Sequence, residues 1–275
     1  MGAILLFPIQ FAGAAGPETT LLEPSFETIE GRLSEGFLLL CDHASNRLPA
    51  EYGDLGLGPE QLRRHIAFDI GTADLTRILA ARLGAPAILS RFSRLLVDLN
   101  RGEDDPTLVM RLSDGAVVPG NAQITPEERA RRIAAYHRPY HDAINAVLDA
   151  GLAAGIRPAI LSLHSFTPVW RGVKRPWQAG VLSALDRRLA ERLLAGLSAD
   201  PELVVGDNEP YSGALKNDTL HRHGANRGLT SAILEVRQDL IADAAGIADW
   251  VDRLVPILQI HAHDPEIHTH YDSQS

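Results

Sequence analysis

Ionisable side chains follow or interrupt several apolar runs of this sequence, where buried strands are expected. The run that ends at Cys41 leads into Asp42 and His43, a second run leads into His164, and a third carries Glu235. An ionisable group on an otherwise apolar strand is costly to bury unless it is paired or bound to a metal. Because the pattern recurs along the chain, we interpret these residues as parts of one chemical site.

A zinc site is the chemistry that these residue types favour. His43 and His164 come from different strands, so both imidazoles can reach one point. One oxygen ligand would complete a three-ligand zinc site with a fourth position for water. That oxygen comes from Asp69 or Asn46, and we prefer Asp69 because a carboxylate binds zinc whereas an amide binds it poorly. Glu235 is then the predicted general base, which takes a proton from the activated water.

Each of these residues also has a purely structural explanation. A single buried histidine is more often a hydrogen-bonded core residue than a metal ligand. Asp69 could cap a helix and Asn46 could hold a turn. Asp42 and Asp98 could be ion-pair partners. Glu235 is harder to explain in this way, since glutamate is rarely buried without a partner. The combination of these residues therefore favours a functional site over separate structural roles.

Arginines beside the apolar run 95–99 predict an anionic substrate. Arg94 precedes this run, and Asn100 and Arg101 follow it. Arginine suits bidentate recognition of carboxylates, so these three residues are predicted to bind the carboxylates of a small substrate. For Arg91, a surface salt bridge is an equally good explanation.

The remaining histidines indicate a metal site less clearly. His137 and His141 have the i, i+4 spacing of a zinc helix, but the glutamate of that motif is missing and Pro139 lies between them. We instead expect His141 to face the site as a hydrogen-bond donor to the substrate. The His-rich end of the chain is more typical of adventitious metal binding or of disorder. No serine stands in a Gly-x-Ser-x-Gly elbow, and Cys41 is expected to be inert packing.

The elements that must position these residues alternate between short apolar strands and helix-like segments. This alternation predicts an α/β three-layer sandwich with a mixed, largely parallel sheet. In such sheets, ligands gather outside the carboxyl ends of the strands. Neither a Walker A nor a GxGxxG motif is found, which argues against nucleotide-dependent chemistry. Strands are predicted at residues 36–41, 85–89, 95–99, 158–163, 180–183, 203–205 and 232–236, and helices at 59–83 with a break near 69–71, at 125–154 with a kink at Pro139, at 186–197 and at 241–260.

Length, charge and cysteine content limit the possible partners and compartment. The 275 residues allow one large domain, which we place at 34–262 between an N-terminal arm (1–33) and a polar, His-rich tail (263–275). The net charge of -9 argues against nucleic acid as the main partner. No apolar stretch is long enough to span a bilayer, so no membrane partner is expected. The single cysteine favours a reducing, cytoplasmic location. Residues 1–16 lack the positive region of a signal peptide, so we prefer a poorly ordered arm.

Seven short pieces of the sequence, in the right order, resemble the N-formylglutamate amidohydrolase family. Together these pieces extend over about residues 36–260, which is nearly the whole chain. The matching pieces are residues 41–46 (CDHASN), 65–71 (HIAFDIG), 93–101 (SRLLVDLNR), 138–141 (RPYH), 163–168 (LHSFTP), 206–212 (GDNEPYS) and 234–241 (LEVRQDLI).

The resemblance implies a fold like that of the zinc-dependent exopeptidases, of the phosphorylase/hydrolase-like kind. It implies hydrolysis of N-formyl-L-glutamate to formate and L-glutamate, a step of histidine breakdown, with one zinc ion. Zinc ligation would carry over to His43 and His164, and the general base to Glu235. Two departures mark a divergent branch. Asn46 stands where a carboxypeptidase-like pattern has a glutamate, and pieces 42–46 and 207–210 differ from members with His-Ser-Gly at the first site.

Two other functions also fit the sequence. A zinc peptidase or amidase could use the same residues on another N-acyl amino acid, a short peptide or a cell-wall fragment. A non-catalytic binding protein on a hydrolase-like scaffold would keep the arginines but would need no metal. Zinc content and a comparison of acyl substrates separate these functions, whereas the oligomeric state cannot be predicted from the sequence.

Overall fold

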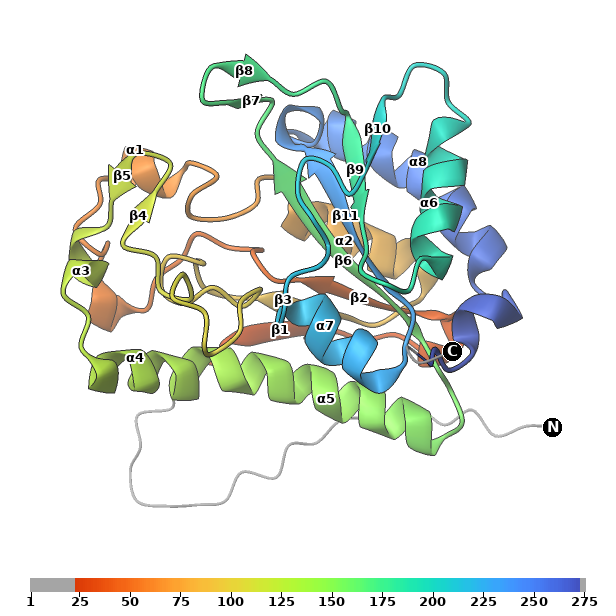
Figure 1. Ribbon diagram of the computed structural model, residues 1–275, viewed down its shortest axis with the longest axis horizontal. Helices are drawn as coiled ribbons and strands as arrows, with labels where there is room; N and C mark the ends of the chain where they lie inside the picture. The colour runs from red at the N-terminus through yellow and green to blue at the C-terminus, as the bar shows by residue number, and fades with distance from the viewer. Residues whose placement is uncertain (1–22, 273–275) are drawn as a thin grey trace.

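A seven-stranded sheet forms the centre of the protein, and helices cover both of its faces (Figure 1). The computed structural model describes residues 23–272, so residues 1–22, including the segment 1–16, lie outside the described residues. The predicted α/β sandwich with a mixed, largely parallel sheet is confirmed. In spatial order the strands are β1 (Phe26–Ile29), β3 (Ala87–Ser90), β2 (Phe37–Cys41), β6 (Ala159–Phe166), β11 (Ser231–Arg237), β9 (Ala179–Leu182) and β10 (Val205–Asp207).

The four central strands β3, β2, β6 and β11 run parallel to one another. At one edge β1 pairs antiparallel with β3, and at the other side β9 pairs antiparallel with β11 while β10 runs parallel to β9. The carboxyl ends of β2, β6 and β11 therefore meet at one edge of the sheet, where ligands bind in folds of this kind.

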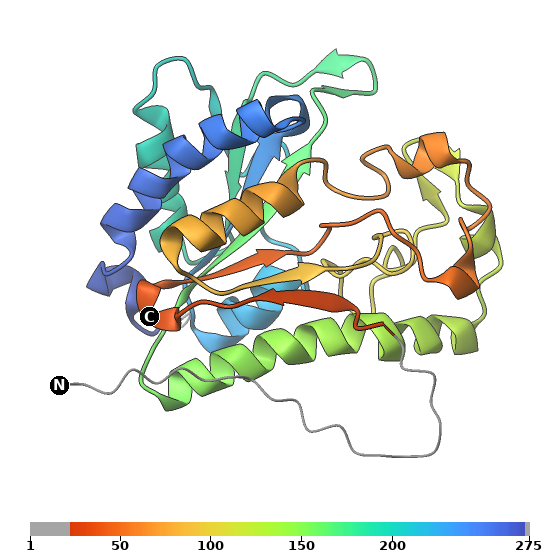
Figure 2. The ribbon, with the colours of Figure 1, turned by 180° about the vertical axis from the view of Figure 1, so that it is seen from behind.

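Two separate apolar layers attach the helices to the sheet. The two ribbon views show these helices on opposite faces of the sheet (Figure 2). On one face α2 (Thr72–Leu83), α6 (Arg188–Ser198) and α8 (Ala244–His261) share a core with alternate strand residues. On the other face α5 (Arg138–Ala153) packs on β2, β3 and β6, and Leu220 of α7 (Thr219–His223) packs on β9 and β11.

Strand alternation decides which face receives the polar residues. Leu163 of β6 and Leu234 of β11 belong to the core beneath α2, α6 and α8. Since successive side chains of a strand point to opposite faces, His164 and Glu235 point to the face covered by α5 and α7. Register then places these two residues side by side, because Glu235 is the β11 partner of His164 on β6.

The predicted strand at 95–99 is wrong. These residues form a buried turn in which the Leu96 N–H donates to the Ser93 carbonyl and the Asp98 N–H donates to the Leu108 carbonyl. The segment is apolar because it packs on two sides: Leu95 contacts one apolar cluster, whereas its neighbours contact another. The apolar run therefore reflects burial between two clusters and not sheet pairing.

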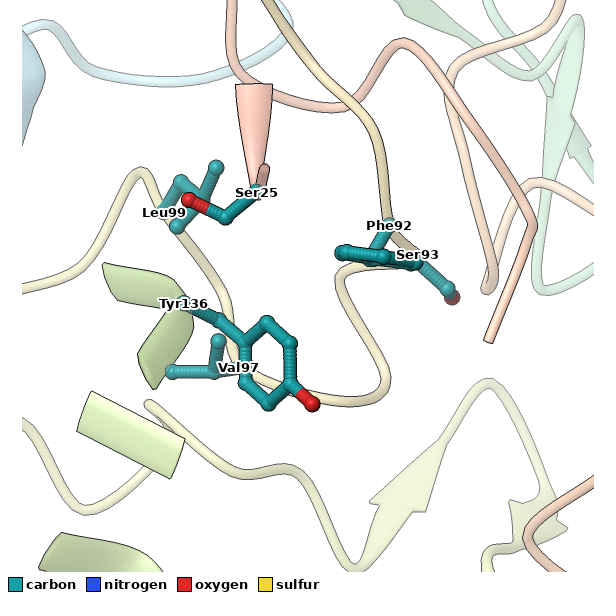
Figure 3. Close-up of a pocket in the computed structure, with 6 residues that line it drawn as sticks. All are labelled: Ser25, Phe92, Ser93, Val97, Leu99 and Tyr136. Atoms are coloured by element: carbon teal, nitrogen blue, oxygen red, sulfur yellow. The ribbon is translucent and has the colours of Figure 1, made fainter. Parts of the chain in front are cut away.

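A cavity of about 10 Å³ lies beside this turn, lined by Ser25, Phe92, Ser93, Val97, Leu99 and Tyr136 (Figure 3). This volume is at the lower limit for holding one water molecule. The cavity is therefore a packing gap between β1, the turn and the helix that carries Tyr136, and it is too small for a substrate.

Most other predicted elements are confirmed, with shifted ends. The predicted helix at 59–83 divides into α1 (Pro59–Leu62) and α2, and turns between them carry Asp69. The helix predicted at 125–154 contains a π-helical turn (Ile133–His137), and Pro139 lies in the first turn of α5 just after it. Sequence reasoning missed β1 within the expected arm. The remaining elements are β4 (Leu112–Ser113), β5 (Ala116–Val117), β7 (Val169–Trp170), β8 (Val173–Lys174), α3 (Pro119–Ala122) and α4 (Pro126–Arg132), with short 3-10 helices at Leu33–Glu35, Ala50–Tyr52, Ala225–Arg227, Gln238–Leu240 and Pro265–His268.

Candidate metal centre

Two histidines and one aspartate lie together at the carboxyl ends of the central strands. His43 follows β2, His164 lies in β6, and Asp69 precedes α2; all three are buried. Asp69 Oδ2 is 2.9 Å from His164 Nδ1 and 3.4 Å from His43 Nδ1. The Asp69 N–H also donates to the His43 carbonyl oxygen at 2.9 Å, which holds the two loops together.

The donor set and its spacing fit a metal ion such as zinc. Ligand atoms at ~2.0–2.1 Å in a tetrahedral site lie roughly 3.3 Å apart, which agrees with nitrogen–oxygen distances of 2.9 and 3.4 Å. One potential ligand atom from each of His43, Asp69 and His164 lies within 4.8 Å of the others. Among residues 23–272, no other group of His, Cys, Asp and Glu meets this spacing. The group could therefore hold a metal, with imidazole and carboxylate ligands that suit zinc.

Each histidine turns its other ring nitrogen toward a second buried carboxylate. His43 Nε2 is 2.8 Å from Asp98 Oδ1, and His164 Nε2 is 3.1 Å from Asp42 Oδ2. A carboxylate in this position fixes the tautomer and the ring orientation of a metal-binding histidine and makes the imidazole more basic. Asp42 and Asp98 therefore orient both Nδ1 atoms toward Asp69.

Hydroxyl groups fix Asp42 in turn. Tyr140 and Thr219 donate to Asp42 Oδ1 at 2.8 and 3.0 Å, and Ser162 donates to Oδ2 at 3.0 Å. Burial alone would raise the pKa of Asp42, but the hydrogen bond and the charge of His164 outweigh it and lower this pKa below its ordinary value. Burial likewise opposes the rise in the pKa of His164, which its two carboxylate neighbours hold well above the usual range.

We expect the substitution Asp42→Asn to weaken zinc binding by about 10- to 100-fold, the typical effect of losing an outer partner of a metal-binding histidine. The amide keeps the size of the side chain but removes the charge that faces His164. Competition with a chromophoric chelator measures the zinc affinity, and Asp74→Asn on the exposed surface of α2 is the matched control. If a folded Asp42→Asn variant binds zinc as tightly as the control, Asp42 does not support the site.

Glu235 lies beside this group with one oxygen unused. It is buried, and its Oε2 atom has no hydrogen-bond partner among residues 23–272. Burial raises the pKa of Glu235 to about 7; His164 opposes this rise and the Asp69 carboxylate adds to it. A carboxyl group whose pKa lies near neutrality can both accept and return a proton.

Arg94 already has partners within the protein. Its Nη2 donates to Asp98 Oδ2 at 2.8 Å, and its Nη1 lies 3.3 Å from Asp69 Oδ1. Burial alone would lower the pKa of Arg94, but these carboxylates raise it instead. The guanidinium therefore balances the charge of two aspartates, and the structure shows it bound to them.

Asn100 and Arg101 lie next to Asp98 at the end of the buried turn. Asn100 Oδ1 accepts from the Thr219 N–H at 3.1 Å. Arg101 Nη1 donates to the Asn100 carbonyl at 2.8 Å, and its Nε is 3.9 Å from a carboxylate oxygen of Asp105. Arg101 is half-buried and keeps donors that form no short hydrogen bond within residues 23–272.

Asn46 and His141 are engaged by other parts of the protein. Asn46 Nδ2 donates to the Leu62 carbonyl at 2.9 Å, and of the two alternatives for the third ligand, the structure brings Asp69 beside both histidines. His141 Nε2 is 3.0 Å from the Leu99 carbonyl and its Nδ1 is 2.8 Å from His223 Nε2. Both nitrogens of the His141 ring have partners, so the expected donor to a substrate is occupied in this arrangement.

A loop that sequence reasoning did not include reaches the site. Gly180 in β9 is the register partner of Glu235, and a Cβ atom there would collide with the carbonyl oxygen of Glu209. Loop 208–213 can therefore pack directly on β9. It brings Tyr211 close to the site: burial raises the pKa of Tyr211, and the Glu235 carboxylate adds to the rise. The family-like piece at 206–212 is the only trace of this loop in the sequence.

A surface hollow lies elsewhere on the protein. It has a volume of about 330 Å³ and is lined by Arg188, Pro265, Glu266 and Thr269. Arg188 pairs with Asp186, which accepts from Thr230 just before β11 begins. The hollow thus lies at the opposite end of β11 from Glu235, and the chemical groups described above take no part in it.

Comparisons with known proteins agree with this architecture. A family model described as N-formylglutamate amidohydrolase matches residues 36–242. The crystal structure of gene product Atu2144 from Agrobacterium tumefaciens is 32% identical with a TM-score of 0.82, covering 89% of this chain and 97% of that one. The N-formylglutamate amidohydrolase from Ralstonia eutropha JMP134 is 21% identical with a TM-score of 0.66, covering 87% of this chain and 97% of that one. No curated protein sequence matches the chain.

Proposed function

This chain belongs to the N-formylglutamate amidohydrolase family, and we propose that it is a zinc-dependent enzyme that hydrolyses N-formyl-L-glutamate to formate and L-glutamate. Membership confirms the resemblance seen in the sequence and makes the chain a hydrolase of amide bonds. One observation carries the finer proposal: His43, Asp69 and His164 converge beside Glu235, a buried carboxyl group with an unpartnered oxygen among residues 23–272.

His43, Asp69 and His164 would hold the zinc ion. When bound, zinc supplies Lewis-acid activation of water and of an amide carbonyl. Asp42 and Asp98 lie within hydrogen-bond distance of Nε2 of the two imidazoles, which fixes the ring orientations and directs both Nδ1 atoms toward Asp69.

Glu235 moves the proton in the proposed reaction. Its unpartnered Oε2 accepts a proton from the attacking water, and the same oxygen returns this proton to the leaving amine nitrogen. Burial raises the pKa of Glu235 to about 7, which favours both directions of transfer. Asn100 and Arg101 would bind one substrate carboxylate, while Arg94 holds Asp69 and Asp98 in place.

The substrate is a small anionic N-acyl amino acid under this proposal, and the protein acts in the cytoplasm during histidine breakdown. Within residues 23–272 no helix combines the length and the apolar character that crossing a membrane requires. Other N-acyl amino acids are alternative substrates of the same site, and the experiment below distinguishes them.

We expect purified protein to contain nearly one zinc per chain and to release formate from N-formyl-L-glutamate. A chelator should abolish this release, and added zinc should restore it, because the proposal assigns the activation of the water and of the amide carbonyl to zinc. Elemental analysis and an enzymatic formate assay measure both quantities on the same sample. Bound zinc without formate release would indicate that the substrate is another N-acyl amino acid. If the protein neither binds zinc nor releases formate after zinc is added back, the proposed function is contradicted.

A further inference from the structure

Arg175 is held between aromatic rings near the candidate metal centre. Its guanidinium carbon lies 4.9 Å from the ring centroid of Tyr211, 5.4 Å from that of Trp170 and 5.5 Å from that of Phe166. Each distance is within the range of a cation–π contact. Three rings thus fix the position of a charged group that follows the β7–β8 hairpin.

Only one edge of this guanidinium is used by the protein. Nη1 donates to the Tyr211 hydroxyl at 3.1 Å and lies 3.3 Å from Thr167 Oγ1. Among residues 23–272, Arg175 forms no ion pair, and its Nε and Nη2 atoms have no hydrogen-bond partner. The Nε–Nη2 edge is one of the two-donor forks with which arginine binds a carboxylate through two parallel hydrogen bonds.

The aromatic rings connect Arg175 with the site. Phe166 lies two residues after His164 in β6, so its ring points to the same face of the sheet as His164 and Glu235. On the other side, Tyr211 lies near Glu235. Burial is the main cause of the raised pKa of Tyr211, and the charge of the Glu235 carboxylate adds to the rise. Arg175 therefore stands at the rim of the site, beyond the reacting groups.

We propose that Arg175 binds the side-chain carboxylate of the substrate and so selects N-acyl derivatives of acidic amino acids. This inference rests on the proposed amide hydrolysis at the same site. A dicarboxylic substrate needs two cationic positions, and Arg94 is already paired with two aspartates. Arg101 lies beside Asn100, near the groups that orient the metal ligands, whereas Arg175 lies on the rim. The rim suits the carboxylate that is farther from the reacting amide.

The test compares N-formyl-L-glutamate with N-formyl-L-glutamine, which has the same shape but lacks the side-chain charge. We expect Arg175→Gln to lower kcat/KM for the glutamate substrate by about 10- to 100-fold, the effect of losing hydrogen bonds to a charged group. The loss with the glutamine substrate should be much smaller. Arg175→Lys should restore only part of the selectivity, because lysine lacks the planar fork. Lys174→Gln, on the exposed hairpin, is the matched control. Equal losses with both substrates, or no loss, would overturn the assignment.

Binding of the product provides a measurement that does not depend on turnover. By calorimetry, the wild-type protein should bind L-glutamate more tightly than L-glutamine, and Arg175→Gln should remove this preference. If the preference depends on Arg175 but no formate is released, the role of Arg175 stands and the proposed reaction fails. If formate is released and the preference survives in Arg175→Gln, the reaction stands and the role of Arg175 fails. Neither formate release nor a preference would contradict both.

Discussion

Glu235→Gln is expected to lower kcat with N-formyl-L-glutamate by about 10²- to 10⁴-fold, the usual contribution of a positioned general base. Glutamine has nearly the same size, so the strand and its neighbours stay in place, but its amide cannot accept the proton of the attacking water. The zinc content should remain that of the wild type, because Glu235 lies outside the group formed by His43, Asp69 and His164.

The measurement is steady-state formate release together with elemental analysis of the same preparation. Glu202→Gln is the matched control, because Glu202 is exposed on the surface. A variant that keeps both its zinc and most of its kcat would remove Glu235 from the proposed proton transfer. Loss of zinc together with kcat would instead make Glu235 part of the metal site.

The substitution Asp69→Asn is expected to lower the zinc affinity by more than about 100-fold. This is more than the loss typical of removing a residue that only orients a metal-binding histidine. An amide oxygen is a poor zinc ligand, and Asp69 is the oxygen donor that lies beside both histidines. Asn46→Ala should leave zinc affinity near the wild-type value, since the Asn46 amide is bonded to the Leu62 carbonyl.

Zinc titration of both variants against a chelator decides between the two alternatives for the third ligand. Asp69 also pairs with Arg94, and breaking a buried ion pair can destabilise a protein by about 3–5 kcal/mol. Thermal unfolding of the metal-free variants must therefore show that both are folded at the assay temperature. Tight zinc binding by folded Asp69→Asn, or its loss in Asn46→Ala, would reverse the assignment.

The sequence predicted most strands of the sheet because strands buried on both faces are short, continuous apolar runs. It also placed His43, His164 and Glu235 near one another, since each is an ionisable residue at or near the end of such a run. Composition could not distinguish a strand from a buried turn at 95–99, because both are apolar on both sides. The difference depends on hydrogen-bond partners that are distant in the sequence.

The roles of the residues that surround the proposed metal ligands were harder to predict from the sequence. Asp42 and Asp98 were predicted as possible ion-pair partners, and Asp98 does pair with Arg94. Their contacts with His164 and His43 could not be predicted, because only the fold brings these pairs together. Arg175 follows a short exposed hairpin, where a basic residue is ordinary. Its role depends on three rings from separate segments that surround it.

Gly180 shows how a position without any functional atom can be as sensitive to replacement as a catalytic residue. Its missing side chain lets the Glu209 carbonyl rest against β9, and the same loop carries Tyr211, which contacts Arg175. In a saturation-mutagenesis map, position 180 should therefore tolerate no replacement, not even alanine. A reader of that map alone would mistake the glycine for part of the reaction chemistry, although it contributes only empty space.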